Sequence, residues 1–437
     1  MLDLRPLRSP GFRHVALTAW VNELGNWVGE VALAILVYDR TGSPLATAAM
    51  FLTLRFLPSL LAPPLTTRVE PLPPRYVLAV LFSLEALIYV VIAAATAQHF
   101  SLPLVLALVA ADGLLAITAT ALTRTVLATG LTRDGLLREG NALINLGAMV
   151  VIAGGPALAG VLAATNGTGT ALRFDAATFL VAALIIVTAR HLRIESDTDA
   201  GFAGRLRAGL QTLRTRPTVS RLVVAIALAI GLGSVALPIE VIFAKQTLHA
   251  GDLGYGLLLT AWGAGMVAGG LGFALAERRT LMAVLGTSAL LEALGYGGLA
   301  AAPTLALACA FSFLGGIGNS AAWVAARTAL QERIPLRRQA AVMAVVESAI
   351  QTAPALGFIA GGAVTALSSP RAAYAVSALG VAAVVAWFTL RPIDRVRLGL
   401  DAAPADPDAR APSDPPEGLQ EMAAPGRNDP TPSLPTG

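Results

Sequence analysis

Charged residues are scarce in this sequence. Only 13% of its 437 residues are Asp, Glu, Lys or Arg, whereas 55% are hydrophobic. A soluble domain of this length needs more charge to cover its surface, so the composition argues against the soluble class. The mean hydropathy of +0.69 agrees with this conclusion. The composition therefore favours a protein that lies within a membrane.

Cysteine and lysine are almost absent, and each absence excludes a class of function. The one cysteine, Cys309, lies inside an apolar stretch, so there is no intramolecular disulfide framework. The one lysine, Lys245, does not follow a glycine, so the chain has no Walker A motif for ATP. The four histidines lack metal-ligand spacing, and no Ser-His-Asp or Cys-His arrangement can be recognised. We therefore expect a protein that is not an enzyme and that has no cofactor and no resident metal.

Long apolar stretches make up most of the chain. A bilayer core about 30 Å thick needs about 20 apolar residues per span, and spans of this kind must be helices because lipid offers no partner for backbone polar groups. An arginine-rich stretch, residues 190–221, separates six such spans from six more. The sequence predicts an all-α membrane protein with 12 transmembrane helices, at residues 15–38, 45–66, 77–97, 103–125, 141–165, 171–189, 219–243, 254–276, 281–301, 304–328, 340–366 and 371–390.

The basic residues predict the orientation of these spans. If both termini are cytoplasmic, all but five of the 31 Lys and Arg residues lie on the cytoplasmic side or in the termini. This bias satisfies the positive-inside rule, so the net charge of +4 needs no nucleic-acid partner. We expect a multi-pass protein of the inner or plasma membrane. The five exceptions are Arg40, Arg55, Arg173, Lys245 and Arg371.

The two sets of six spans resemble each other. The run Leu84–Leu87 with Tyr89 recurs 207 residues later, and Val31 and Pro156 begin shorter runs that recur at offsets of 204 and 198. Parallel six-span repeats are typical of one large class of secondary transporter. We therefore predict bundles at 1–190 and 219–395, joined by a cytoplasmic linker at 191–218 and followed by a proline-rich disordered tail at 396–437. Within the linker, residues 203–216 fit either an amphipathic helix on the membrane surface or a plain basic loop.

Ionisable residues inside the spans are the candidates for function, because a charge within a bilayer is costly. In the first span Glu23, Asn26 and Glu30 share one helix face. Arg55 in the second span is the expected partner of one of these glutamates. Four more acidic residues in spans are candidates for proton coupling or substrate contact: Glu85, Asp112, Glu240 and Glu292.

Each of these residues has a functional and a structural interpretation. A carboxylate in a poorly solvated cavity can exchange a proton near neutral pH, and alternating exposure would couple that proton to substrate movement. Alternatively, Glu23 or Glu30 neutralises Arg55 and holds two helices together. Glu85 and Glu292 occupy equivalent repeat positions, which favours a shared structural role, and Glu240 lies near a span end where water could solvate it.

A glycine–proline motif lies within the fifth predicted span. Gly155, Pro156 and Gly160 stand close together there. Glycine lets helices approach closely, and proline bends a helix by leaving a carbonyl unpaired. The motif predicts a hinge between the halves, with ordinary close packing as the alternative.

Several short stretches resemble one transporter family over residues 10–395. The chain is similar to the major facilitator superfamily, and within it to the bacterial twelve-span drug and macrolide exporters. The resemblance rests on Leu24–Trp27, on Leu36–Ser43, on Phe174–Leu180, on Gly254–Leu258 and on the Gly155-Pro156 pair with Gly160. It implies the two-bundle fold, and the Gly-Pro motif marks antiporters in that superfamily.

Two stretches depart from the family pattern. The family's loop between the second and third spans holds a glycine and adjacent basic residues that this chain lacks, although Glu70 and Arg75 remain. The equivalent loop of the second half keeps Glu277 and Arg278. The resemblance implies that these four residues form a cytoplasmic gate. Asn26 stands where the group often carries an aspartate, so Glu23 or Glu30 would supply the charge.

These features lead to one expected function and two alternatives. We expect alternating-access efflux of hydrophobic or amphipathic small molecules in exchange for protons by a monomer, with Arg55 tuning the proton affinity of Glu23 and Glu30. One alternative is an exporter of siderophores or other metabolites, or an importer, with the same fold. The other is a membrane sensor or scaffold that does not transport.

Overall fold

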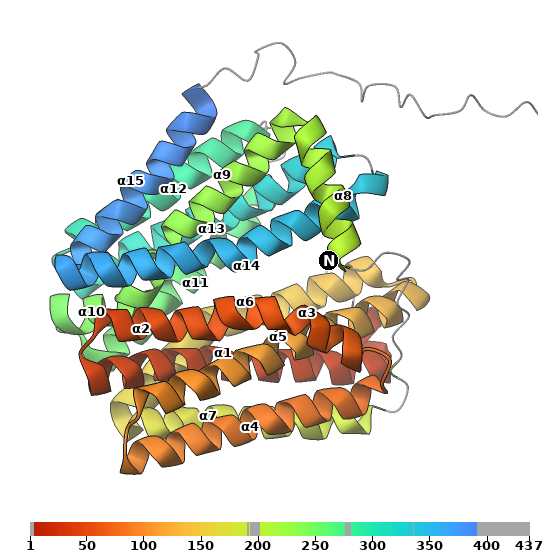
Figure 1. Cartoon of the computed structure of the whole chain (residues 1–437), viewed down its shortest axis with the longest axis horizontal. Helices are drawn as coiled ribbons and strands as arrows, with labels where there is room; N and C mark the ends of the chain where they lie inside the picture. Colours follow the sequence, from red (N-terminus) through yellow and green to blue (C-terminus); the bar gives the residue numbers. More distant parts are fainter. Residues whose placement is uncertain (1–3, 190–191, 193–201, 276–280, 335, 391–437) are drawn as a thin grey trace, which may run out of the picture. The chain divides into compact units, whose positions relative to one another are not determined.

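The computed structural model describes residues 4–189, 192, 202–275, 281–334 and 336–390. Every regular element in these ranges is a helix, as predicted (Figure 1). The elements of the first half are η1 (Arg5–Arg8), α1 (Pro10–Thr41), α2 (Pro44–Phe51), η2 (Leu52–Phe56), α3 (Leu57–Val69), α4 (Pro74–Gln98), α5 (Leu102–Arg133), α6 (Leu137–Asn166) and α7 (Thr168–Thr188). The elements that follow are α8 (Phe202–Thr215), α9 (Pro217–Gly233), η3 (Leu237–Ile239), α10 (Glu240–Ile242), η4 (Phe243–Thr247), α11 (Gly251–Leu275), α12 (Leu281–Ala301), α13 (Leu305–Arg333), α14 (Leu336–Leu367) and α15 (Pro370–Leu390).

Proline and glycine set several helix boundaries. Pro10 and Pro44 stand at the first positions of α1 and α2, where a missing N–H costs nothing. Gly42, with φ of +61°, ends α1 in a left-handed conformation that few other residues adopt. Ser43 then accepts a hydrogen bond from the backbone N–H of Ala46, 3.3 Å away, and so caps α2. Such local signals explain why neighbouring helices are joined by short connections.

Eleven helical segments of the described chain are long and apolar enough to cross a membrane. α1 has 32 residues but is not among them, because Glu23, Asn26 and Glu30 lower the hydropathy of its middle. Large aliphatic side chains such as Leu367 and Leu379 are 89% and 71% exposed on the outer surface, as lipid-facing residues are. The all-helical membrane class is therefore confirmed, whereas the count of twelve spans and the cytoplasmic location of both termini stay predictions.

Two predicted spans are not continuous α-helices. The second span, predicted at 45–66, contains the π-helical turn η2 between α2 and α3, and Arg55 lies in that turn. The seventh, predicted at 219–243, breaks after α9 and continues through η3, with Pro238, to Thr247. Hydropathy alone does not reveal such breaks, because they change hydrogen bonding and not composition. π-helical turns within helices are frequent at functional sites.

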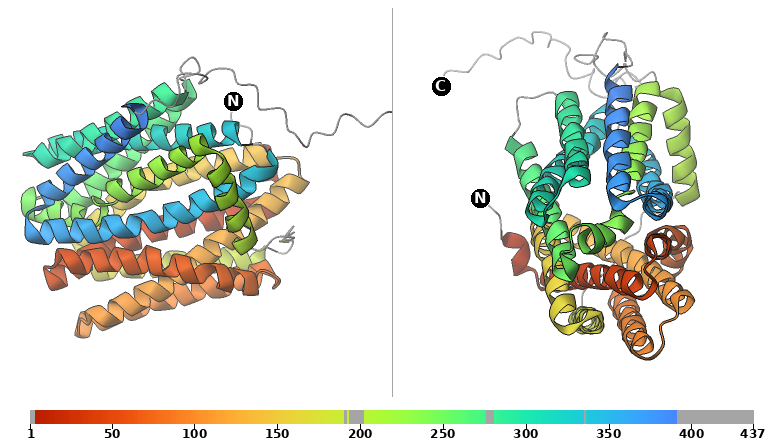
Figure 2. Two further views of the ribbon diagram at one scale, coloured as in Figure 1. Left: turned by 45° about the horizontal axis from the view of Figure 1, so that its top comes forward. Right: turned by 90° about the vertical axis from the view of Figure 1, so that its left-hand side faces the viewer.

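Helices pack mainly within their own half of the chain. α1 contacts α6 and α7, α4 contacts α5 and α7, and in the second half α13 lies between α11 and α12 (Figures 1 and 2). Contacts between the halves are made chiefly by α6 with α11 and by α2 with α14. Residues 1–391 form one compact unit, so the division at 190 and 219 stays a prediction. The predicted tail at 396–437 lies outside the described residues.

The linker between the halves contains the helix α8. Leu206 and Leu213 of this helix belong to an apolar cluster with Val342 and Val345 of α14. The backbone of Gly209 lies so close to α14 that a β-carbon there would collide with the carbonyl of Ala341. Part of the apolar face is thus covered by protein, and a location on the membrane surface stays a prediction.

Candidate functional site

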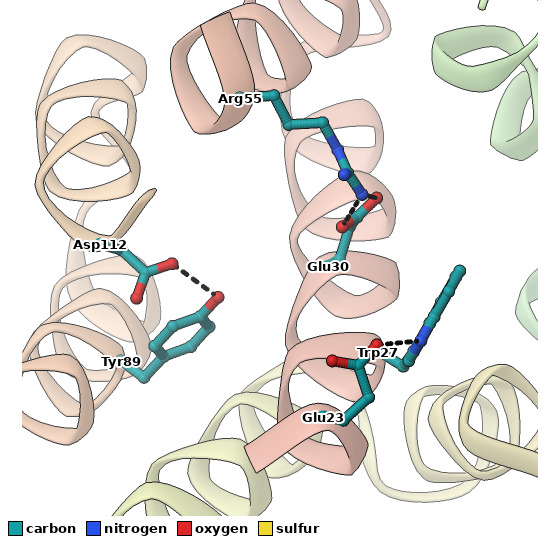
Figure 3. A network of polar contacts seen from close by, with 6 residues as sticks. All are labelled: Glu23, Trp27, Glu30, Arg55, Tyr89 and Asp112. Carbon is teal, nitrogen blue, oxygen red and sulfur yellow. Dashed lines mark hydrogen bonds and ion pairs between the residues drawn. The ribbon is translucent and has the colours of Figure 1, made fainter. Parts of the chain in front are cut away.

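The centre of the predicted site is a charged pair between α1 and η2. One terminal guanidinium nitrogen of Arg55 lies 2.7 Å from Oε1 and 2.5 Å from Oε2 of Glu30 (Figure 3). The side chain of Glu30 is 17% exposed and that of Arg55 is 46% exposed, so the pair is only half-buried. The structure therefore brings Arg55 to Glu30, as the sequence predicted for one of the two glutamates.

The other two polar residues of the α1 face do not join this pair. Glu23 instead accepts a hydrogen bond from the indole N–H of Trp27, one helical turn along, at 3.2 Å (Figure 3). Asn26, which lies between these two glutamates in the sequence, is half-buried. Its side chain forms no hydrogen bond in the described part of the chain. This face of α1 thus carries the Glu30–Arg55 ion pair and, separately, the Glu23 carboxyl, which holds the indole ring of Trp27.

Glu85 and Asp112 lie on the other side of α1, in the interior of the first half. Both are buried, with 0% and 3% of their surface exposed. Tyr89 donates a hydrogen bond from its hydroxyl to Oδ2 of Asp112 at 3.2 Å (Figure 3). Asp175 of α7, which the sequence analysis did not select, is 0% exposed and lies within electrostatic reach of both. The sequence does mark Asp175, because it is an aspartate inside an apolar span. The sequence analysis used its stretch only for the resemblance to a family motif.

In the second half, Glu240 is not solvated at its span end. It is 7% exposed, and its Oε2 atom has no hydrogen-bond partner. The buried side chains of Tyr255 and Tyr374 lie within electrostatic reach, as does Glu30 of α1. The expectation of a hydrated Glu240 is wrong because the break after α9 turns α10 inward. The broken span therefore places a carboxyl opposite the Glu30 pair.

Glu292 lies in a separate polar contact of the second half. Asn319 of α13 donates a hydrogen bond from its side-chain amide to Oε1 of Glu292 at 3.0 Å. Tyr296 lies one turn along α12 and stacks on Trp262 with ring centroids 5.3 Å apart. Glu292 is therefore partnered by a neutral donor, unlike Glu30, which is paired with the charged Arg55.

The glycine–proline motif of α6 lies at the contact between the halves. A β-carbon at Gly160 would come within 3.0 Å of the Gly256 Cα atom on α11, and one at Gly256 would come within 2.6 Å of the Pro156 carbonyl. A β-carbon at Gly155 would lie 2.9 Å from Trp27, within the first half. The motif thus packs closely against two neighbours, and its role as a hinge stays a prediction.

The four predicted gate residues are only partly described. Glu70 follows the end of α3, and the side chain of Arg75 at the start of α4 donates to the hydroxyl of Tyr76 at 2.7 Å. No ion pair between Glu70 and Arg75 occurs in the part of the chain that the structure describes. Glu277 and Arg278 lie outside the described residues, so the gate stays a prediction.

A second charged contact joins the two halves directly. The ammonium of Lys245, in η4, bonds to Asp39 near the end of α1. The same ammonium bonds to Asp252 at the start of α11 at 2.6 Å. The sequence analysis placed Lys245 among the exceptions to the positive-inside rule and gave it no role. Its isolation as the one lysine of the chain was the available signal.

The arrangement offers polar groups on both sides of the contact between halves. Among the residues that the structure describes, no three His, Cys, Asp or Glu side chains are placed to hold a metal ion. What the geometry can do is bind protons on buried carboxyls and exchange ion-pair partners when helices move.

The sequence of the whole chain matches one family profile. The family is described as transmembrane secretion effector, MFS_3, and its profile matches residues 2–413. The chain belongs to this family. No curated protein matches the chain in sequence. The family match identifies a membrane transporter of the major facilitator type, and the solved structures described next share its fold.

Solved transporter structures share the fold of this family member at low sequence identity. A nucleoside transporter, NupG, is 12% identical with a TM-score of 0.72, covering 87% of this chain and 98% of that chain. A bacterial homologue of the lysosomal transporter Spinster, in an inward-facing and unoccupied conformation, is 14% identical with a TM-score of 0.63, covering 87% and 95%. A bacterial homologue of the iron transporter ferroportin, in an inward-facing state, is 15% identical with a TM-score of 0.66, covering 86% and 97%. At these identities the similarity shows the fold alone.

Proposed function

We propose that this transporter exports hydrophobic or amphipathic small molecules across the cell membrane in exchange for protons. The observation that carries the proposal is the Glu30–Arg55 pair, in which a π-helical turn of the second membrane segment holds a guanidinium against an exchangeable carboxylate of α1. A substrate cation or a proton competes with Arg55 for this carboxylate. The family description, a secretion effector, supports the outward direction.

The proposed mechanism is alternating access by twelve spans with both termini in the cytoplasm. Under this topology, Asp39, Lys245 and Asp252 lie at the outer end of the molecule. The contact between Gly160 and Gly256, and that between Phe51 and Phe358 with ring centroids 5.8 Å apart, join the halves toward the same end. These contacts support a state that is closed to the outside, from which substrate would be taken up on the cytoplasmic side.

The opposing carboxyl of the second half supports a preference for cationic substrates. Glu240 carries an unpartnered oxygen beside the aromatic rings of Tyr255 and Tyr374. Aromatic faces and a carboxylate together attract an organic cation. We therefore propose that Glu30 and Glu240 contact a positively charged amphipathic substrate from the two halves.

Proton movement in proteoliposomes tests the proposal. Purified protein is reconstituted with a pH-sensitive dye inside, and tetraphenylphosphonium, a macrolide and a hydroxamate siderophore are added one at a time. We expect at least one compound to move protons with the native protein and not with a Glu23→Gln, Glu30→Gln double variant. Equal signals from both proteins would remove the coupling from α1, and the absence of any signal would favour a membrane protein that does not transport.

A further inference from the structure

Three buried carboxyl groups from three helices lie within electrostatic reach of one another in the interior of the first half. Glu85 comes from α4, Asp112 from α5 and Asp175 from α7, and each is at most 3% exposed. Both carboxyl oxygens of Glu85, Oδ1 of Asp112 and Oδ2 of Asp175 lack a hydrogen-bond partner. We call these three residues the carboxyl cluster. Buried polar atoms are nearly always paired, so this many unpartnered oxygens need an explanation.

The charges around the carboxyl cluster do not neutralise it. From α4, the hydroxyl of Tyr89 bonds to Asp112. From α1, the nearest charge is Glu30, which is also acidic and lies within electrostatic reach of Tyr89. From η2, the guanidinium of Arg55 is already bonded to both oxygens of Glu30. No basic side chain in the described part of the chain pairs with the cluster, so its charge can be lowered only by binding protons.

α1 separates the carboxyl cluster from the Glu30–Arg55 pair and touches both. A β-carbon at Gly29 would lie 2.8 Å from Cε1 of Tyr89 and would collide with the carboxyl of Asp175. Glu30 is the next residue along the same helix, and Figure 3 shows its carboxyl turned away from Tyr89 and Asp112. A change of charge in the cluster therefore acts on the backbone of α1 beside the central pair.

The second half provides an internal comparison. At the offset of 207 that relates Glu85 to Glu292 and Tyr89 to Tyr296, Asp112 corresponds to Asn319. Asn319 donates to Glu292 at 3.0 Å, so the same helix crossing is built there with one carboxyl and one amide.

Residues around the two helix crossings can also be compared through the repeat. At the offset of 204 shared with Val31, Gly29 corresponds to Gly233, whose β-carbon would lie 3.3 Å from the Tyr296 hydroxyl. At the offset of 198 that relates Arg173 to Arg371, Asp175 corresponds to the buried Ala373. The fold therefore forms this crossing without the acidic groups that Asp112 and Asp175 add.

We propose that the carboxyl cluster is a proton-binding site of the first half, separate from the substrate contacts, which holds about two protons in the state closed to the outside and releases them when α1 moves. Binding converts a carboxylate and a proton to a neutral carboxylic acid, and release reverses this. This role rests on the proposed proton exchange, with the cluster supplying the coupling protons.

Infrared spectroscopy of the full chain in lipid tests whether protons are held, without any substrate. The carbonyl stretch of neutral carboxylic acids is compared between the native protein and an Asp112→Asn, Asp175→Ala variant, which copies the groups of the second half. We expect the variant to lose the part of the band that Asp112 and Asp175 contribute, while the buried acids that remain, Glu85 among them, keep theirs. An Asp134→Asn variant, which changes an exposed carboxyl, is expected to keep the whole band. An unchanged band in the double variant would overturn the proposal.

A reciprocal variant keeps the proposal testable if the double variant fails to fold. Asn319→Asp places a second carboxyl beside Glu292, and we expect it to increase the neutral-acid band of the native protein. Failure to increase this band would count against the argument that such a pair must bind a proton.

Transport then tests the coupling role of the cluster. The number of protons moved per tetraphenylphosphonium is measured in proteoliposomes for the native protein and for Asp112→Asn, Asp175→Ala. A fall of about twofold or more in that ratio supports coupling through the cluster. An unchanged ratio overturns the coupling role even if the infrared band is lost. If the native protein moves no protons with any probe, the proposed function fails, while the infrared comparison still decides whether the cluster holds protons.

Discussion

The ammonium of Lys245 lies between Asp39 of the first half and Asp252 of the second half. The side chain of Lys245 is 20% exposed, so the contact is partly shielded from solvent. Because the chain has no other lysine, no neighbouring residue of the same type can replace it. Removing its charge leaves two aspartates facing each other across the contact between halves.

Lys245→Gln is expected to favour opening at this end of the molecule. A partly exposed ion pair contributes about 1 kcal/mol, which corresponds to about a fivefold change in the ratio of open to closed molecules. The measurement is maleimide labelling of an Ala48→Cys variant in a Cys309→Ala background, because Ala48 is 4% exposed at the contact of α2 with Gly362 of α14. Lys245→Arg retains the charge and serves as the control. Equal labelling rates with and without Lys245 would show that the ion pair does not hold this end closed.

The Glu30–Arg55 pair is expected to show strong coupling between its two residues. Arg55→Gln removes a charge-assisted hydrogen bond and leaves Glu30 unpaired within a membrane segment, so we expect a loss of about 2 kcal/mol in the free energy of unfolding. Glu30→Gln in the same molecule removes the unpaired charge and is expected to restore about 1 kcal/mol. Unfolding in one detergent, followed for the single variants and the double variant, gives the coupling energy. Additive losses would contradict a direct interaction.

Gly29 is expected to tolerate no side chain. Its β-carbon would meet Tyr89 and Asp175, so Gly29→Ala should lower the free energy of unfolding by about 1–3 kcal/mol. Gly154 of α6 is the matched control, because no atom lies within 4 Å of a β-carbon there. Gly154→Ala should stabilise the helix by up to about 1 kcal/mol. If the two variants unfold alike, the close approach of α7 to α1 is not what requires glycine at position 29.

The helical membrane class could be predicted from the sequence, because the hydropathy of a segment depends only on its own residues and not on how the helices pack. The sequence was a weaker guide to the helices that carry the candidate site. The middle of α1 is less apolar than the other membrane segments because it carries the candidate site residues Glu23, Asn26 and Glu30. Predicted spans also ended too early, as at 125 where α5 continues to Arg133, because helices extend beyond the apolar core of a bilayer.

The pairing of Arg55 with one glutamate of α1 could be predicted from the sequence, but the choice between the two glutamates could not. Helical spacing put Glu23 and Glu30 on one face, yet only Glu30 reaches Arg55, since partner choice depends on where η2 places the guanidinium. Asp175 was missed although it is an aspartate inside an apolar span, because the residues that give it meaning come from α4 and α5. The sequence repeat already relates Asp112 to Asn319. The significance of this difference is visible only in the structure, where Asn319 is bonded to Glu292.

Glu240 offers a test of the charge preference of the transporter. Its Oε2 atom is buried without a partner beside aromatic rings, so a cation that enters this space gains a charged contact and relieves an unpaired group. Glu240→Gln keeps the shape and removes the charge. We expect it to weaken tetraphenylphosphonium binding about tenfold, or about 1.4 kcal/mol, while leaving the binding of an uncharged amphipathic compound within about twofold. Both are measured by equilibrium dialysis on the purified protein in lipid nanodiscs.

Glu292→Gln is the matched control for this measurement, because Glu292 is also a buried carboxyl of the second half but is already bonded to Asn319. Since its carboxylate has a neutral donor, a substrate cation gains less from it, and we expect cation binding to change less than threefold, or by less than about 0.7 kcal/mol. A similar loss from both variants would indicate a general effect of negative charge in the second half. No loss from Glu240→Gln would remove this residue from the substrate site and leave Glu30 as the carboxylate that selects for positive charge.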